Sequence, residues 1–379
     1  MIEVIVNRPS FEYDIHSLVK SFFPREDVQI HVQDTFTEDT ALRISVEFTD
    51  ETVSICLMEQ GEEKESGVSV INYAERKETK NRLKRQLYQL LCAYTGQTLP
   101  WGTLTGIRPA KIAMGLIEQG MSNVETAEYM RNTYLASKEK VALSVMIANR
   151  ERYVLRNIDY KDGYSLYVGI PFCPSICLYC SFSSYPLERW RKQVDQYLDA
   201  LCKELDYVAD RFRDKKLNTV YIGGGTPTTL EPYQLDRLLT KIQSKFDTEH
   251  LQEFTVEAGR PDSITREKLQ VLLNHGIDRI SINPQTMNQK TLEIIGRRHT
   301  VDQVKEAFTL ARSMGFAHIN MDLIVGLPGE SYDDVEHTMK ELEAMAPDSV
   351  TVHSLAIKRA ARLSLFKDKY EEMGLENNM

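Results

Sequence analysis

The residues best suited to chemistry are three cysteines within eight positions, Cys173, Cys177 and Cys180, in the stretch "IPFCPSICLYC". Thiolates this close together can bind a metal centre. A structural zinc site closes with four ligands, and no histidine lies in or beside this stretch to complete the set. Cysteine thiolates hold iron–sulfur clusters, and one short loop with C-x3-C-x2-C spacing can hold three corners of a [4Fe–4S] cluster. The spacing favours a cluster with one open iron over zinc, and over three unrelated buried thiols.

The elements that must position these cysteines begin near residue 164, where short β-rich runs alternate with amphipathic helical stretches. We expect strands at residues 165–170, 218–224, 253–258, 279–284, 318–326 and 349–355. This alternation predicts an α/β fold with a parallel sheet and right-handed crossovers, either open or curled into a partial, six-unit barrel. Ligands bind beyond the C-terminal ends of such strands. The cysteines lie there, whereas His250 and His275 precede strands and belong to the opposite end.

Further polar groups follow the later strands. The second strand ends in "GGGTPT" (223–228), and glycines let a backbone approach a ligand closely. Glu257 and Gln285 end the third and fourth strands, and Asp322 lies in the apolar run "NMDLIVGLP", where a buried carboxylate needs a partner. Polar groups at successive strand ends converge, which predicts a cofactor pocket. The alternatives are a plain turn at the glycines and a structural hydrogen bond for Asp322.

The remainder of the chain indicates how the domains are organised and adds no residues to the predicted site. Strand-like stretches open the sequence, and helical periodicity follows from about residue 73, interrupted at 98–111 by a predicted helix-to-helix connection. We expect the isolated Cys56, Cys92 and Cys202 to be buried small hydrophobic residues. The predicted domains are a small α+β module at 1–72, a helical connector at 73–160, the partial barrel at 161–360, and the start of a truncated C-terminal region at 361–379.

The composition limits the classes of protein that this chain can be. It has 379 residues, of which 42% are hydrophobic and 27% charged, and a net charge of −9. This predicts a globular protein, without the basic surface of one that coats nucleic acid. No apolar run could span a membrane, and "MIEVIVNRPS" lacks the features of a signal peptide. We therefore expect a cytoplasmic protein with reduced thiols and no nucleic-acid partner. A zinc-stabilised nucleic-acid-binding module is the alternative from another class.

Five motifs together carry a resemblance to a known family. They are "YVGIPFCPSICLYCSF", "GGGTPTTL", "RISINPQTM", "IIGRRHT" and "NMDLIVGLPGES". In combination they resemble the radical S-adenosylmethionine (SAM) enzymes and, among these, the oxygen-independent coproporphyrinogen III oxidases and their relatives, which include heme chaperones. The additional N-terminal module and the "VGIPFC" variant are most similar to the HemZ-type branch. The resemblance covers residues 164 to about 356 and implies the partial β/α barrel of radical SAM proteins.

The resemblance also assigns roles to single residues. It implies that Cys173, Cys177 and Cys180 are the catalytic ligands of three irons of a [4Fe–4S] cluster, and that SAM chelates the fourth iron through its amino and carboxylate groups. The other cofactor-binding residues that it implies are Tyr167, Tyr179, Gly224, Gly225, Thr226, Glu257, Gln285, Arg297, Asp322 and Ala356. Most relatives have a histidine immediately before "IPFC", where this chain has Gly169.

The chemistry that the resemblance implies is a radical decarboxylation. A one-electron donor such as flavodoxin or ferredoxin reduces the cluster, SAM is cleaved to a 5′-deoxyadenosyl radical, and coproporphyrinogen III is converted to protoporphyrinogen IX in heme biosynthesis. The alternative within the family is a heme-binding chaperone without oxidase activity. The expected ligand is accordingly a porphyrinogen or heme.

Overall fold

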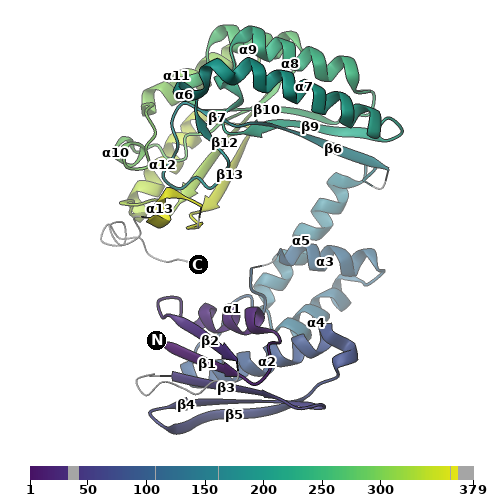
Figure 1. The fold of residues 1–379 in the computed structure, drawn as a ribbon, viewed down its shortest axis with the longest axis vertical. Coiled ribbons are helices and arrows are strands. Elements are labelled where there is room, and N and C mark those ends of the chain that lie inside the picture. The colour runs from purple at the N-terminus through teal and green to yellow at the C-terminus, as the bar shows by residue number, and fades with distance from the viewer. Residues whose placement is uncertain (33–41, 107, 161, 359, 366–379) are drawn as a thin grey trace. The chain divides into compact units, whose positions relative to one another are not determined.

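The chain forms two compact units that divide between Asn157 and Ile158 (Figure 1). The computed structural model describes residues 1–32, 42–106, 108–160, 162–358 and 360–365. Most of the predicted C-terminal region, 366–379, therefore lies outside the described residues. No helix in the described part of the chain combines the length and apolar character needed to cross a bilayer.

The first unit contains a five-stranded sheet in the order β2-β1-β3-β4-β5. The strands are β1 (Ile2–Val6), β2 (Val28–Val32), β3 (Leu42–Phe48), β4 (Thr52–Glu59) and β5 (Glu62–Val70). Helices α1 (Glu12–Phe22) and α2 (Arg76–Thr95) share one apolar core with this sheet, in which Leu18, Leu83 and Leu87 are fully buried. The strand-like character that was expected at the start of the sequence is confirmed.

Three further helices complete the first unit. They are α3 (Pro109–Glu118), α4 (Asn123–Tyr134) and α5 (Lys138–Leu155), which pack around a separate small core. Ser122 and Glu125 form a capping box that starts α4, and this satisfies backbone N–H groups that a helix start leaves unpaired. The predicted helix-to-helix connection is confirmed, because α2 ends at Thr95 and α3 begins at Pro109.

The second unit contains a six-stranded parallel sheet in the order β13-β12-β11-β10-β9-β6. Its strands are β6 (Gly163–Ile170), β9 (Lys216–Gly224), β10 (Glu253–Gly259), β11 (Arg279–Ile282), β12 (His318–Val325) and β13 (Ser349–Ser354). All six were expected from the sequence. Each strand pairs with its predecessor along the chain, so the order lacks the reversal of a doubly wound sheet. The sheet is therefore the partial barrel.

Helices connect these strands and cover one face of the sheet, as Figure 1 shows for α7, α8 and α9. The long crossover helices are α7 (Val194–Arg211), α8 (Pro232–Lys245), α9 (Arg266–Asn274), α11 (Val301–Met314) and α12 (Tyr332–Met345). The shorter elements are β7 (Phe172–Cys173), β8 (Tyr185–Pro186), α6 (Leu187–Trp190), α10 (Gln289–Ile294) and α13 (Arg362–Leu365). Two short 3-10 helices, Pro227–Thr229 and Pro261–Ser263, follow β9 and β10.

The two faces of the barrel strands differ in chemistry. On β6, Leu166, Val168 and Ile170 are buried in the core beneath the helices, whereas Tyr167 between them is 61% exposed. Side chains alternate along a strand, and the pairing of adjacent strands puts Tyr167 and Tyr221 on the same, inner face. The inner face of the sheet is thus polar and aromatic, and is available for a ligand.

The isolated cysteines require a correction. All six cysteines are free thiols, as expected, but Cys56, Cys92 and Cys202 are half-buried rather than buried. Each lies on a strand or helix next to a buried residue, at the margin of a core rather than inside it.

Candidate functional site

A cavity of about 260 Å³ lies at the C-terminal ends of the barrel strands. Most of the residues singled out from the sequence line it: Cys173, Cys177, Tyr179, Cys180, Gly224, Gly225, Thr226, Glu257, Gln285, Arg297 and Asp322. Tyr167 and Ala356 do not. Tyr167 stacks on Tyr221 of the inner face, with ring centroids 5.9 Å apart, and Ala356 is exposed beyond β13. The strand-end rule therefore brings the predicted residues together, apart from these two.

The cysteine loop follows β6 and is held against the segment after α10. The backbone N–H of Leu178 donates to the carbonyl of Ile295 at 2.9 Å, and the hydroxyl of Ser175 donates to the carbonyl of Gly296 at 2.8 Å. Within the loop, the N–H of Cys180 donates to the carbonyl of Cys177 at 3.2 Å. These bonds fix the loop so that all three cysteines line the cavity.

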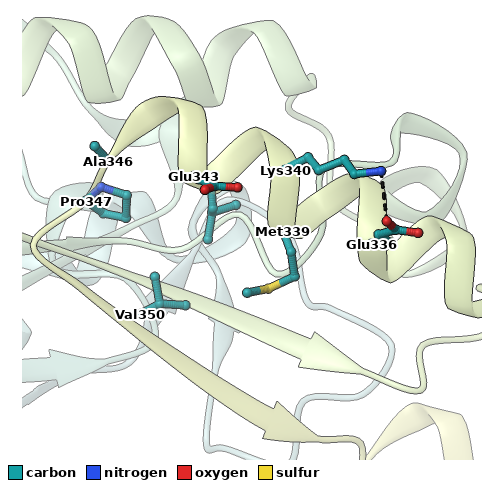
Figure 2. A pocket seen from close by; sticks show the side chains of 8 residues that line it. Glu336, Met339, Lys340, Glu343, Ala346, Pro347 and Val350 are labelled. Carbon is teal, nitrogen blue, oxygen red and sulfur yellow. Dashed lines mark ion pairs between the residues drawn. The ribbon is translucent and has the colours of Figure 1, made fainter.

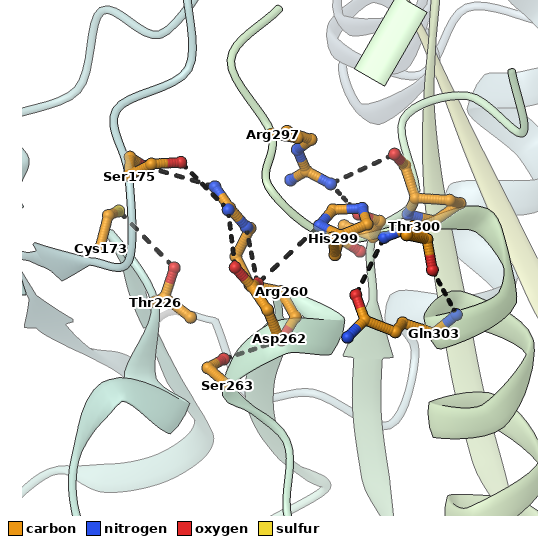
Figure 3. A network of polar contacts seen from close by, with 12 residues as sticks. Cys173, Ser175, Thr226, Arg260, Asp262, Ser263, Arg297, His299, Thr300 and Gln303 are labelled. Atoms are coloured by element: carbon orange, nitrogen blue, oxygen red, sulfur yellow. Dashed lines mark hydrogen bonds and ion pairs between the residues drawn. The ribbon is translucent and has the colours of Figure 1, made fainter. Parts of the chain in front are cut away.

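The glycine run after β9 packs directly on the cysteine loop. The N–H of Gly225 donates to the carbonyl of Ile170 at 2.7 Å, and the hydroxyl of Thr226 lies 3.6 Å from Sγ of Cys173 (Figure 3). A Cβ on Gly225 would lie 2.7 Å from the carbonyl oxygen of Phe172 and 3.0 Å from Sγ of Cys173. Only glycine allows this approach. The run therefore brings two loops together at the mouth of the barrel.

Two carboxylates lie on the inner face beside these loops. Glu257 accepts hydrogen bonds from the hydroxyl of Tyr221 at 3.4 Å and from Nδ2 of Asn283 at 3.2 Å. Burial, with the nearby charge of Asp322, raises the pKa of Glu257 from 4.5 to about 7. Asp322 itself accepts a hydrogen bond from Nδ2 of Asn320 at 2.7 Å. Glu257 can therefore keep its proton near neutral pH, and both side chains can accept hydrogen bonds from a polar ligand.

Gln285 occupies a strained position at the end of the fourth strand unit. Its φ of 68° lies in the left-handed region that a residue with a side chain rarely adopts. Two backbone bonds hold it there: its N–H donates to the carbonyl of Asp322 at 2.9 Å, and its carbonyl accepts from the N–H of Ile324 at 3.0 Å. Strain of this kind is typical of ligand sites, where the surrounding structure holds a residue in an unfavourable backbone conformation.

Two buried guanidinium groups distinguish one cysteine from the other two. Burial raises the pKa of the Cys177 thiol, but the charges of Arg297 and Arg260 outweigh this and lower its pKa below the ordinary value. Burial instead raises the pKa of Cys173 to about 11, and it also raises the pKa of Cys180. Cys177 is therefore the thiol whose surroundings most favour the thiolate, which is the form that binds metals.

Arg260, Asn283 and His353 are among the lining residues that were not singled out from the sequence. Asn283 and His353 lie at or near the ends of the fourth and sixth strands, so the strand-end rule could have found them. Arg260 follows the third strand, and nothing in the local sequence indicates that it reaches the cysteines. His250 and His275 are not among the lining residues, as expected; His275 instead contacts Asp236 at 2.9 Å.

The lining residues fit a large polar group better than a single metal ion. Among the described residues, no three side chains of His, Cys, Asp or Glu converge closely enough to hold one ion. A [4Fe–4S] cluster spreads its ligands over several irons and does not need such convergence. Moreover, Nε of Arg297 and Oδ1 of Asn283 are buried without a hydrogen-bond partner among the described residues. Buried polar atoms normally have partners, and a polar ligand in this cavity would supply them.

A second, larger cavity lies on the opposite, helix-covered face of the sheet, between α12 and β13 (Figure 2). Val350 lines it, and the partner of Val350 on β12 is the buried Met321, whereas the neighbouring pair Asp322 and Thr351 faces the inner side. None of its lining residues is a cysteine or a histidine, and its ion pair joins Lys340 to Glu336 at 2.8 Å. The first cavity is therefore the candidate site.

Comparisons with known proteins agree with this geometry. Residues 167–342 match the sequence profile of the Radical SAM superfamily. Over 304 residues the chain is 41% identical to the oxygen-independent coproporphyrinogen-III oxidase-like protein HemZ of Bacillus subtilis, a match that covers 79% of this chain and 61% of HemZ. It is 38% identical over 195 residues to the heme chaperone HemW of B. subtilis, with 51% of each chain covered.

The matches to a curated oxidase and to a solved structure cover less of each chain than the match to HemZ does. The chain is 33% identical over 192 residues to the oxygen-independent coproporphyrinogen III oxidase of Salmonella typhimurium, covering 51% of this chain and 42% of the oxidase. The solved coproporphyrinogen III oxidase HemN of Escherichia coli matches with a TM-score of 0.48 and 27% identity, covering 59% of this chain and 55% of HemN. The chain thus spans between 42% and 61% of these curated relatives. Residues 167–342 therefore belong to the radical SAM superfamily, and the chain is similar to HemZ, to HemW and to an oxygen-independent coproporphyrinogen III oxidase.

Proposed function

We propose that this chain is a radical SAM enzyme whose cysteine loop holds a [4Fe–4S] cluster. Cys173, Cys177 and Cys180 would each ligate one iron, and SAM would occupy the adjacent cavity and chelate the fourth. The observation that carries this proposal is that the three thiols line one cavity together with the glycine run and the strand-end carboxylates. When bound, the cluster supplies an electron for the cleavage of a C–S bond of SAM.

The residues of the chain would bind and orient SAM. Gly224 and Gly225 leave the backbone of their loop free of side chains where the methionine part would lie. Glu257 and Asp322 would accept hydrogen bonds from ammonium and hydroxyl groups. Nε of the buried Arg297, which has no partner in the described part of the chain, would donate to an anionic or carbonyl oxygen. Because these groups are buried or half-buried, their interactions with a ligand are weakly screened by water.

We further propose that the substrate is coproporphyrinogen III, which would be decarboxylated to protoporphyrinogen IX with electrons from a flavodoxin or ferredoxin. The identity to an oxygen-independent coproporphyrinogen III oxidase supports this substrate. A heme chaperone without oxidase activity is the second candidate, and the higher identity to HemW over a similar length favours it. The two candidates share the cluster site and differ in turnover.

Anaerobic reconstitution with iron and sulfide tests the cluster. We expect about four irons per chain and an absorption band in the visible range. Replacing Cys177→Ala should abolish iron retention, whereas Cys202→Ala, which changes a half-buried thiol on α7, should leave it unchanged. A Cys177→Ala variant that retains a full cluster would contradict the proposed ligand role.

Turnover separates the two candidates. With dithionite and SAM, an oxidase should release 5′-deoxyadenosine and should convert coproporphyrinogen III to protoporphyrinogen IX. Stoichiometric heme binding by a reconstituted protein that forms neither product would instead identify a chaperone.

A further inference from the structure

We propose that Arg260 is a positioning residue that clamps the cysteine loop and raises the reduction potential of the cluster by donating a hydrogen bond to the sulfur of Cys177. This inference rests on the proposed function, because it concerns the cluster that this loop would hold. It assigns a role to a residue whose side chain is 4% exposed and to which the proposed function gives none.

The guanidinium of Arg260 directs its donors to two sides (Figure 3). On one side, Nε and Nη2 donate to the two carboxylate oxygens of Asp262 at 3.1 and 3.0 Å. On the other, Nη2 donates to the hydroxyl of Ser175 at 3.1 Å, and Nη1 donates to the carbonyl of Ser175 at 3.3 Å and lies 3.7 Å from Sγ of Cys177. A planar guanidinium group can donate several hydrogen bonds at once in fixed directions. Arg260 thus joins the loop after β10 to the middle of the cysteine loop.

The surroundings of Arg260 hold this geometry in place. The hydroxyl of Ser263 donates to the backbone carbonyl of Arg260 at 2.7 Å, which fixes the main chain. A second basic side chain lies near Asp262, since Nδ1 of His299 lies 3.8 Å from its Oδ1. Burial and the neighbouring guanidinium groups lower the pKa of His299 to about 3. The imidazole is therefore neutral, and the ion pair of Asp262 is with Arg260.

The contact with sulfur has a redox consequence. Reduction adds one electron and one negative charge to a cluster and its thiolates, and no bond to Arg260 is made or broken. Hydrogen bonds to ligand sulfurs are among the factors that set the potential of an iron–sulfur cluster. A buried cation that also donates to the sulfur stabilises the reduced form more than the oxidised form. Arg260 should therefore make the cluster easier to reduce by dithionite or by a flavodoxin.

The midpoint potential of the reconstituted cluster, measured by a dithionite titration followed by electron paramagnetic resonance, tests this role. We expect Arg260→Met to lower the equilibrium constant for reduction about tenfold, which is about 59 mV for one electron. Arg260→Lys keeps the charge but places its donors on a single nitrogen, and should recover part of the difference. The control Arg279→Met removes a guanidinium that pairs with Glu253 at the opposite ends of the strands, and should leave the potential unchanged.

Two outcomes would overturn the inference and leave the proposed function standing, and a third would refute the proposed function. If wild-type protein and Arg260→Met hold equal iron at equal potentials, Arg260 does not act on the sulfur. If Arg260→Met holds no iron, the potential is measured in Arg260→Gln, which is neutral and similar in length; an unchanged potential there has the same meaning. A wild-type chain that binds no cluster at all would instead refute the proposed function.

Discussion

The hydroxyl of Thr226 donates a hydrogen bond to Sγ of Cys173 across 3.6 Å, so the loop after β9 holds the first cysteine of the loop after β6. Thr226 is 1% exposed, and its own N–H donates to the carbonyl of Phe172 at 2.8 Å. The two loops therefore behave as one structure, and a change in the glycine loop should affect iron binding.

The first prediction concerns Gly225→Ala. The new Cβ would lie 2.7 Å from the carbonyl oxygen of Phe172, which is backbone and cannot rotate away. The loops must separate, at a cost of about 1–3 kcal/mol. We expect the variant to retain less than half of the wild-type iron after reconstitution, as measured by iron and sulfide analysis.

Gly169→Ala is the matched control for this prediction. Its Cβ would meet Cε1 of Tyr167 at 3.6 Å, an ordinary contact, so it should retain wild-type iron. Equal iron contents in Gly225→Ala and Gly169→Ala would show that the close approach of the two loops is not required.

The second prediction concerns the pH dependence of stability at Glu257. Its folded-state pKa of about 7 lies above its ordinary value of 4.5, so folding favours the protonated carboxyl. The stabilisation from this proton is complete below pH 4.5 and is lost as the pH rises through 7. Glu257→Gln cannot ionise, and should make the cluster-free protein more stable than the wild type by up to about 3 kcal/mol at pH 8.

The difference in unfolding free energy between wild type and Glu257→Gln should be measured by urea denaturation at pH 8 and at pH 4.5. It should fall below about 1 kcal/mol at the lower pH, because the wild-type carboxyl is then protonated in the folded state. A stabilisation that is equal at both values would show that ionisation of Glu257 is not its cause.

The third prediction concerns Lys268 of α9, which joins the loops after β9 and β10. Its Nζ is buried and donates to the carbonyls of Thr228 at 2.7 Å and Ser263 at 3.2 Å. Lys268→Met keeps the length of the side chain but removes both bonds, and should destabilise the second unit by about 2 kcal/mol in urea denaturation.

Lys203→Met, at an exposed position on α7, is the control for Lys268→Met and should change the unfolding free energy by less than about 0.5 kcal/mol. If the two variants unfold alike, the buried ammonium of Lys268 does not hold the loops.

Much of the barrel was predictable because its signals are local. All six strands lie within two residues of the expected ranges at each end, since each is a β-rich run between amphipathic helices. Whether the sheet is doubly wound or curled was not predictable in this way. Strand order results from which strands pair in space, and only the pairing of each strand with its predecessor shows a partial barrel.

The candidate site was likewise predictable only in part. The spacing of Cys173, Cys177 and Cys180 and the polar residues at strand ends were visible in the sequence, because parallel strands present their C-terminal ends on one side. Tyr167 and Ala356, expected from the resemblance, do not line the cavity, whereas Arg260, Asn283 and His353 do. Whether a residue lines the cavity depends on the direction of its side chain and on the path of its loop, and strand periodicity predicts neither.

The sequence by itself determined which thiols would hold the proposed cluster and where along the chain they lie. Only the tertiary structure decided the electrostatic environment of each thiol. Arg260 and Cys177 are separated by 83 residues and meet across 3.7 Å. Electrostatic and hydrogen-bond energies depend on distance through space and on burial, so no motif could reveal that Cys177, among three similar cysteines, is the one beside two buried guanidinium groups.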